Sequence, residues 1–246
     1  MRIAILLLST VAAALAQAPA APAFEVASVR AGQPGRESIE TGPASLTMQH
    51  IRLKGSIRWA YGVQEVQLSG PAWLNDVWFD IFAKASQAVT VGQLREMLRT
   101  LLADRFKLAI HREQQEMGAL VIVVAKSGHK LEPVEQEGSP SFTQDKLSLT
   151  GRGAELGQLF DFIANELHVP VVNQTGLTGR FNYFFDIDPY YTEASRSLAG
   201  ADGKPPDANN IIAVAMQKEL GLKVEEKKVQ VEVIVVDHAE KTPIEN

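Results

Sequence analysis

The sequence predicts an α+β protein built from two pseudo-repeated halves, with helices packed on a largely antiparallel sheet. Residues 70–81 and 176–187 both open on glycine and close on Phe-Asp-Ile. The same offset pairs apolar positions in front of them, such as Leu53 with Leu159. Self-similarity at a fixed spacing is typical of a duplicated architecture. Apolar periods of two and of 3.6 residues also alternate along both halves, which indicates strands and helices in turn.

The first half is expected to hold two helices. Apolar side chains recur at helical spacing in residues 53–61, and Gly62 is placed to end that helix. Thr90 and Gln93 have the spacing of a capping box, which predicts the start of the second helix. Its apolar stripe is formed by Val91, Leu94, Leu98, Leu101 and Leu102. Strands are expected at residues 24–29, 46–50, 66–69, 78–83, 106–110 and 119–125.

The second half is expected to repeat this order. Its helices are predicted at residues 156–167 and 211–220, and its strands at residues 146–149, 169–172, 181–187, 222–224 and 231–236. Pro170 has no backbone N–H, which places its strand at a sheet edge. Each half then runs strand, helix, strand, strand, helix, strand, strand. This is the order of a ferredoxin-like, split βαβ unit with one strand added.

The N-terminus has the form of a secretory signal peptide, with basic Arg2, an apolar stretch and a small-x-small cleavage site before Gln17. No later stretch approaches the ~18 consecutive apolar residues of a transmembrane helix. We therefore expect a soluble protein without a membrane span after cleavage, exported to the periplasm or the extracellular space. The predicted segments are a signal peptide at 1–16, an Ala/Pro leader at 17–23, a first repeat at 24–130, an acidic linker at 131–139, and a second repeat at 140–246 with a polar insertion at 189–206.

The amino-acid composition and charge exclude several kinds of catalytic site and partner. The 246 residues include no cysteine, which excludes disulfides, thiolate metal ligands and a thiol nucleophile. A formal net charge of −5 argues against nucleic acid as a partner, because binding to phosphates needs a basic surface. The first half is net basic and the second net acidic. This separation holds the halves together, attracts an anionic partner such as cell-wall polymer, or reflects only solvated helix faces.

Four residues are candidates for ligand binding. Thr175, Thr178 and Arg180 lie in a loop with two glycines, where hydroxyls and backbone N–H groups can hold a phosphate. A strand is expected to follow rather than a helix, so the alternative is a structural hairpin turn whose glycines supply positive φ. Trp73 lies in a Gly-Pro turn, where we expect it to be exposed. Together with other aromatics such as Trp59, it either lines a sugar or peptide groove or packs in the core.

Three residues are catalytic candidates. Asp80 and Asp186 hold the same position in the two repeated stretches and formally supply the carboxylate pair of a hydrolase, although repeat symmetry alone explains their match. His238, at the end of a predicted strand, is either a metal ligand, a base or a solvated side chain. No His-Glu-x-x-His, Gly-x-Ser-x-Gly or Ser-x-x-Lys motif is present. We therefore predict no cofactor and no metal site.

Several motifs along the chain match one known family. They are FEVASV at 24–29, AYGV at 60–63, GPAW at 70–73, FDI at 79–81, LLADRFKL at 101–108, TGLTGR at 175–180 and VVDHAEK at 235–241. With them the chain resembles the exported domain-of-unknown-function family expanded in soil acidobacteria. The resemblance implies no assigned activity and no catalytic residue. Some members of that family are joined to antibiotic-sensor-type membrane peptidases, so a sensory role here is expected to need a separate membrane partner.

These features favour a non-catalytic binding or interaction module of the cell envelope. Its partner is expected to be an envelope protein or a cell-wall polymer. One alternative is a metal- or water-dependent hydrolase that uses Asp80, Asp186 or His238. The other is a sensory domain that acts with a separate membrane peptidase.

Overall fold

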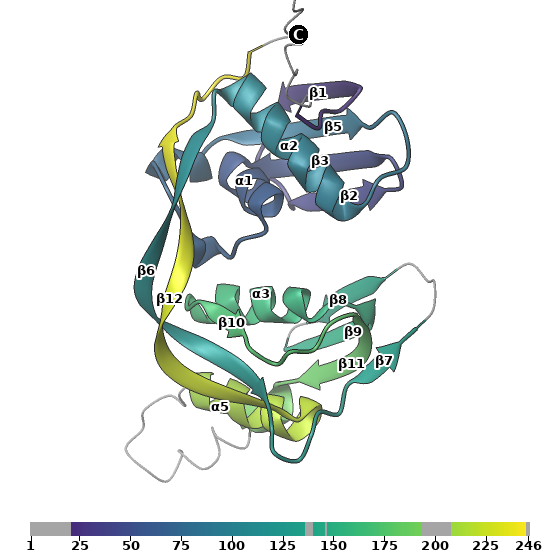
Figure 1. The fold of residues 1–246 in the computed structure, drawn as a ribbon, viewed down its shortest axis with the longest axis vertical. Helices are drawn as coiled ribbons and strands as arrows, with labels where there is room; N and C mark the ends of the chain where they lie inside the picture. The colour runs from purple at the N-terminus through teal and green to yellow at the C-terminus, as the bar shows by residue number, and fades with distance from the viewer. Residues whose placement is uncertain (1–20, 136–139, 146, 193–207, 245–246) are drawn as a thin grey trace, which may run out of the picture.

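The computed structural model describes residues 21–135, 140–145, 147–192 and 208–244. Figure 1 shows two lobes arranged along the longest axis of the molecule and joined along one side by a long two-stranded ribbon. Helices are mixed with three four-stranded sheets whose strand pairs are mostly antiparallel, so the predicted α+β class is confirmed. Within the described part of the chain, no helix is long and apolar enough to cross a membrane.

The first lobe is an antiparallel sheet against which two helices pack (Figure 1). Its strand order is β1-β5-β3-β2. The elements are β1 (Val26–Ala31), β2 (Ser38–Gly42), β3 (Ser45–Arg52), α1 (Leu53–Tyr61), β5 (Trp78–Lys84) and α2 (Val91–Phe106). Alternate strand residues and one stripe of each helix meet in a core that includes Leu46, Met48, Phe79, Ile81, Ile57, Leu98, Leu102 and Phe106. The rings of Phe79 and Phe106 meet edge to face, with centroids 4.8 Å apart.

The helix ends of this lobe follow the predicted caps. The hydroxyl of Thr90 accepts a hydrogen bond from Gln93 N at 3.2 Å, and Thr90 N donates to the Gln93 side chain at 2.9 Å. The capping box is therefore confirmed. Helix α1 ends at Gly62, whose φ is 65° and whose N–H donates to Arg58 O at 2.8 Å. Val91 was expected in the apolar stripe of α2 but is 47% exposed, whereas Leu94, Leu98, Leu101 and Leu102 are buried.

The second lobe also has a four-stranded sheet, in the order β7-β11-β9-β8. Its elements are β7 (Glu132–Val134), β8 (Ser141–Asp145), β9 (Ser148–Ala154), α3 (Leu156–Leu167), β11 (Arg180–Asp186), α5 (Ala208–Ala215) and the π-helical turn η3 (Met216–Leu220). Its core contains Leu149, Phe181, Phe185, Leu159, Phe160, Ile163, Ile212 and Met216. In Figure 1, α3 lies on the side of this lobe that faces the first lobe.

The ribbon consists of β6 (Ala109–Val124) and β12 (Leu222–His238), which pair antiparallel over nearly their whole length. Two short strands pair with it in parallel, β10 (Val171–Asn173) beside β6 and β4 (Leu68–Ser69) beside β12. The order in this third sheet is β10-β6-β12-β4. The edge position predicted for the strand that follows Pro170 is thus confirmed.

The ribbon corrects the predicted order of elements. The strands expected at 106–110 and 119–125 are parts of β6, and those expected at 222–224 and 231–236 are parts of β12. The middle of β6 is exposed at almost every position, because the ribbon there lies outside both cores. The sequence of such a strand shows neither alternating apolar residues nor a continuous apolar run, so the pattern does not predict it. The first half runs three strands, a helix, two strands, a helix and one strand. The described part of the second half has the same order apart from a short helical segment at residues 188–192, so the predicted ferredoxin-like order is wrong.

The two cores also do not follow the predicted division at residue 130. Leu120 and Ile122, near the end of β6, belong to the second core, whereas Ile234 and Val236, near the end of β12, belong to the first. Each lobe therefore contains the end of a strand from the other half. Part of the segment expected to be a linker, 131–139, forms β7 and pairs with β11. The signal peptide predicted at 1–16 and most of the insertion predicted at 189–206 lie outside the described residues.

Candidate functional site

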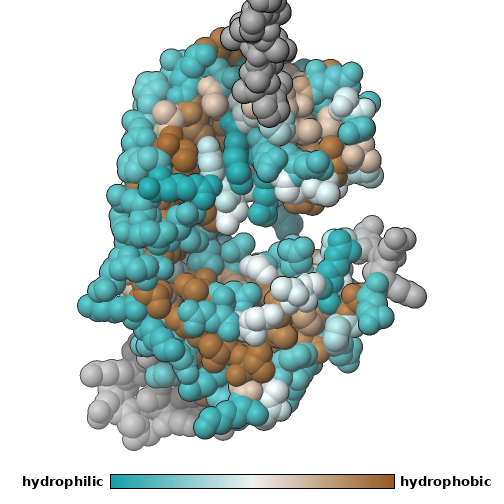
Figure 2. All heavy atoms as spheres, in the orientation of Figure 1, coloured by the Kyte–Doolittle hydropathy of each residue, from teal (hydrophilic) through white to brown (hydrophobic). Residues whose placement is uncertain are grey.

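A cleft of about 340 Å³ lies between the two lobes. Figure 2 shows the molecule hollowed between the lobes on the side away from the ribbon. Ile39, Arg58, Trp59 and Arg95 line it from the first lobe, and Glu155 and Asp161 from the second. Hollows of similar volume lie along the ribbon beside α5, beside the N-terminal strand, and over β9 and β11. The inter-lobe cleft is distinguished from them because residues of both lobes line it.

Arg95 is a cation of the cleft without an ion-pair partner among the described residues. It extends from the second turn of α2, and its guanidinium lies 5.4 Å from the centroid of the Trp59 ring on α1. A Cβ on Gly62 would lie 2.7 Å from Arg95 Nη1, so the glycine that ends α1 leaves room for the guanidinium. Arg95 Nε is buried and has no acceptor in the described part of the chain, as is also the case for Arg58 Nε. The aromatic ring, rather than a carboxylate, holds this cation in place.

Arg58 extends from the first lobe to the second. Its Nη1 donates to Glu65 Oε2 at 3.1 Å, and its Nη2 donates to Asn165 Oδ1 on α3 at 3.2 Å. Burial raises the pKa of Glu65, but the charges of Lys54 and Arg58 outweigh burial and hold that pKa below its usual value. The charge of Arg58 is therefore balanced within the protein, whereas the charge of Arg95 is not.

The second-lobe wall of the cleft is acidic. Glu155 occupies the N-cap position of α3, and Asp161 lies in the second turn of that helix. Partial desolvation raises the pKa of Asp161, and the opposing influence of Arg58, Gln64 and Arg95 does not cancel it, although the side chain remains exposed. No side chain caps the N-terminus of α3, so its first backbone N–H groups have no side-chain acceptor. The cleft thus places basic groups on one wall and acidic groups on the other.

Gln64 fixes the two lobes relative to each other. Its Nε2 donates to Val171 O at 2.9 Å, and its Oε1 accepts from Val171 N at 2.9 Å. Gln64 is 7% exposed and Val171 6% exposed, so both bonds are shielded from water. Gln67 Nε2 also donates to Glu232 O of β12 at 3.1 Å. These bonds connect the segment after α1 to β10 and to the ribbon, and they set the separation of the cleft walls.

The predicted loop of Thr175, Thr178 and Arg180 does not contribute to this cleft. Asn173 Oδ1 accepts from Thr175 N at 3.0 Å and from its hydroxyl at 2.7 Å, and Leu177 N donates to that hydroxyl at 3.1 Å. Gly176 and Gly179 have φ of 69° and 96°. The polar groups around Thr175 are thus used within the loop, which fits the alternative of a structural turn before β11.

Trp73 lies in η2 (Ala72–Asn75), and it is half-buried rather than exposed as expected. It packs against the first core, and Lys241 Nζ lies 5.4 Å from its ring centroid. Lys241 belongs to the segment after β12, in which Glu240 N donates to Phe106 O at 2.7 Å. Trp73 does not line the cleft, where Trp59 is the tryptophan in the wall.

The structure does not bring Asp80 and Asp186 together as a carboxylate pair. Asp80 lies in β5 and accepts a hydrogen bond from His50 N at 2.8 Å. Asp186 ends β11 in the other lobe and accepts from Asp188 N at 3.0 Å. His50 has a φ of 49° and lies in a bulge of β3, so Asp80 anchors an irregular backbone position.

Asn182, rather than Asp186, holds in the second sheet the place that Asp80 holds in the first. Asn182 Oδ1 accepts from Gly153 N at 2.9 Å, Gly153 has a φ of 54°, and the register of β9 and β11 shifts at this point. The predicted correspondence of Asp80 with Asp186 is therefore wrong. The Phe-Asp-Ile match is out of register, because Asp186 lies four residues after Asn182 in β11.

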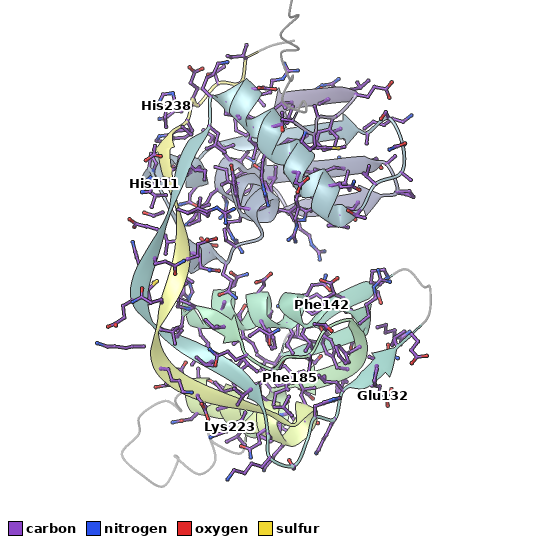
Figure 3. All side chains as sticks on the ribbon, viewed as in Figure 1. His111, Glu132, Phe142, Phe185, Lys223 and His238 are labelled. Carbon is purple, nitrogen blue, oxygen red and sulfur yellow. The ribbon has the colours of Figure 1, made fainter. Side chains whose placement is uncertain are left out.

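His238 and His111 both lie at the end of the ribbon beside the first lobe (Figure 3). His111 Nδ1 is 2.7 Å from Asp237 Oδ1, and His238 pairs with Ala109 in the ribbon. Both histidines are exposed. Among the described residues, no group of three or more His, Cys, Asp or Glu side chains forms a metal-ligand set.

We expect replacement of Asp80 by alanine to destabilise the fold by about 2 kcal/mol, because the N–H of His50 in the bulge loses a charged acceptor. Asp80→Asn is expected to keep most of the stability, since an asparagine has the same role at position 182. Asp186→Ala is the matched control, with a change within about 0.5 kcal/mol, because the bond that Asp186 accepts from Asp188 N is exposed to water whereas that of Asp80 is partly buried. Urea unfolding monitored by circular dichroism measures all three. Unchanged stability of Asp80→Ala would contradict the anchoring role.

Arg58, Arg95 and Asp161 were not singled out by sequence motifs. They lie on three helices and meet only because the lobes face each other, so no spacing along the chain marks them. The sequence feature related to them is the opposite net charge of the two halves.

A family model described as "Protein of unknown function (DUF3738)" matches residues 54–239. The matched span begins in α1, ends just after β12, and includes Arg58, Arg95 and Asp161. No curated protein and no solved structure matches the chain. The matched span covers well over half of the residues, and the chain therefore belongs to the DUF3738 family of proteins of unknown function.

Proposed function

We propose that this protein is an exported, non-catalytic binding protein whose ligand occupies the cleft between the two lobes. The observation that carries the proposal is the state of Arg95 in that cleft. Its guanidinium stacks on Trp59, its Nε is buried without an acceptor, and no described carboxylate pairs with it. A buried, unpaired polar group is costly, and a ligand that pairs with it removes that cost.

The form of the cleft supports a small ligand. A volume of about 340 Å³ is in the range of small-molecule sites. Trp59 and Ile39 supply apolar contact area, while charged side chains on both walls supply orientation. The catalytic alternative has less support, because Asp80, Asp186 and His238 lie outside this cleft and the first two bond to nearby backbone groups.

The proposal includes a duplicated origin for the lobes. Strand orders β1-β5-β3-β2 and β7-β11-β9-β8 support it, since they match element by element along the chain. The bulges anchored by Asp80 and Asn182 support it further. A cleft between two related lobes is a common place for a ligand, because both lobes contribute to its walls. Export to the periplasm or beyond the cell rests on the signal peptide in residues 1–16.

The experiment is thermal unfolding of the mature protein against a panel of carboxylates, phosphates, amino acids, short peptides, sugars and cell-wall fragments. At least one compound is expected to raise the Tm of the wild type, because a ligand that binds only the folded state stabilises it. Arg95→Gln is expected to abolish that shift. Arg105→Gln is the matched control, since Arg105 lies in the last turn of the same helix and donates to Ile244 O instead.

Two outcomes would overturn the proposal. One is that no compound raises the Tm of the wild type. The other is that Arg95→Gln responds as the wild type does. Mass spectrometry of each compound after incubation tests the non-catalytic part, because conversion to a product would support the hydrolase alternative.

A further inference from the structure

The charges that line the cleft divide into balanced and unbalanced ones. Glu37 is balanced by Arg52, with 3.3 Å between Oε1 and Nε, and Arg58 is balanced by Glu65 at 3.1 Å. Three charged residues remain: Arg95, Glu155 and Asp161 line the cleft and form no ion pair with another described residue.

The unbalanced charges have opposite signs on opposite walls. Arg95 extends from α2 of the first lobe, whereas Glu155 and Asp161 extend from the start of α3 in the second. Asp161 lies close enough to Arg95 for the guanidinium to lower its pKa, but the two are not in an ion pair. The space between the walls is therefore bounded by a cation on one side and carboxylates on the other.

We propose that the cleft binds a short peptide with free ends, whose carboxylate pairs with Arg95 and whose ammonium group pairs with Asp161 and Glu155. A guanidinium and a carboxylate form charge-assisted bonds with good geometry, as do a carboxylate and an ammonium group. The apolar surface of Trp59, Ile39 and Val63 beside these groups fits apolar peptide side chains. This inference rests on the proposed function and names its ligand class.

The environment of Asp161 agrees with a cationic group in the ligand. Arg58 from α1, Arg95 from α2 and the Gln64 amide all favour its ionised form, and Glu155 shares its wall. Partial desolvation nevertheless raises its pKa. An ammonium group beside Asp161 favours the carboxylate, so peptide binding is expected to lower the pKa of Asp161.

Calorimetric titration of the full mature protein with four probes tests the proposal: alanyl-leucine, its N-acetyl form, its C-terminal amide and the doubly blocked form. The free dipeptide is expected to bind at least ten-fold more tightly than either singly blocked form, because each block removes one charge-assisted contact. Arg95→Gln should weaken binding of the free dipeptide but abolish the difference between acid and amide. Asp161→Asn should abolish the difference between free and acetylated amine.

Each outcome has a distinct meaning. Equal affinity of the free and acetylated peptides would overturn the proposal and leave a simple anion site, in which case the proposed function survives. Failure of all four probes, while another compound of the thermal panel binds, would overturn the peptide class alone. Arg105→Gln is the charge-matched control and should keep the full pattern. The blocked probes on the wild type decide the question even if a variant fails to fold.

Discussion

Replacing Gly221 by alanine is expected to destabilise the protein by about 3 kcal/mol. Gly221 ends η3 with a φ of 66°, and a Cβ there would lie 2.3 Å from Gly128 O. Two hydrogen bonds hold the segment 125–130 against this turn, from Ala125 N to Gly221 O and from Lys130 N to Leu220 O, both at 2.9 Å. The new methyl group meets a backbone oxygen, so the backbone itself must shift to make room for it. The resulting strain adds to the free energy that an alanine loses by adopting a left-handed backbone conformation.

Gly176→Ala is the matched control for this experiment. Gly176 has nearly the same φ, 69°, but a Cβ there would have no atom within 4 Å. It therefore reports the cost of the left-handed backbone alone, about 1 kcal/mol. Urea unfolding midpoints compare the two variants. Equal losses would show that the contact with Gly128 has no effect and that only the backbone conformation matters.

Replacing Gln64 by leucine is expected to cost about 2–4 kcal/mol, because the N–H and the C=O of Val171 both lose their buried partner. Leucine has a similar size, so the loss is one of hydrogen bonding rather than of volume. The lobes are also expected to separate, which small-angle X-ray scattering measures as a larger radius of gyration.

Gln158→Leu is the control for the Gln64 variant. Gln158 lines the cleft from α3 but is exposed, so its replacement is expected to change stability by less than about 0.5 kcal/mol. If Gln64→Leu unfolded at the same urea concentration as this control, and with an unchanged radius of gyration, Gln64 would not hold the lobes.

Local chemistry made parts of the fold predictable. The capping box at Thr90 and the glycine at the end of α1 act within one turn of backbone, and both are found as predicted. The edge position of β10 followed from the missing N–H of Pro170. Such features depend on neighbours in the sequence, so the sequence contains all the information they need.

Features that depend on tertiary contacts were missed. The middle of the ribbon has polar side chains on both faces because neither lobe covers it, and this pattern is the same as that of a loop. The counterpart of Asp80 in the second sheet could not be found by matching Phe-Asp-Ile, because that motif ends four residues beyond Asn182 and the connection from helix to strand is shorter in the second half, 168–179 against 62–77. The cleft arises only when α1, α2 and α3 face one another, so its residues have no common motif.

The ribbon also has a kinetic consequence. Its strands pair Val124 with Leu222 and Ala109 with His238, residues that are separated by a large part of the chain. Since each core includes the end of a strand from the other half, neither core is complete until these distant segments meet. Chains dominated by such remote pairings fold slowly, because loop closure must precede the contacts that compensate for it. Folding of this protein should therefore be limited by closure of the ribbon, with both lobes reaching their final packing in the same step.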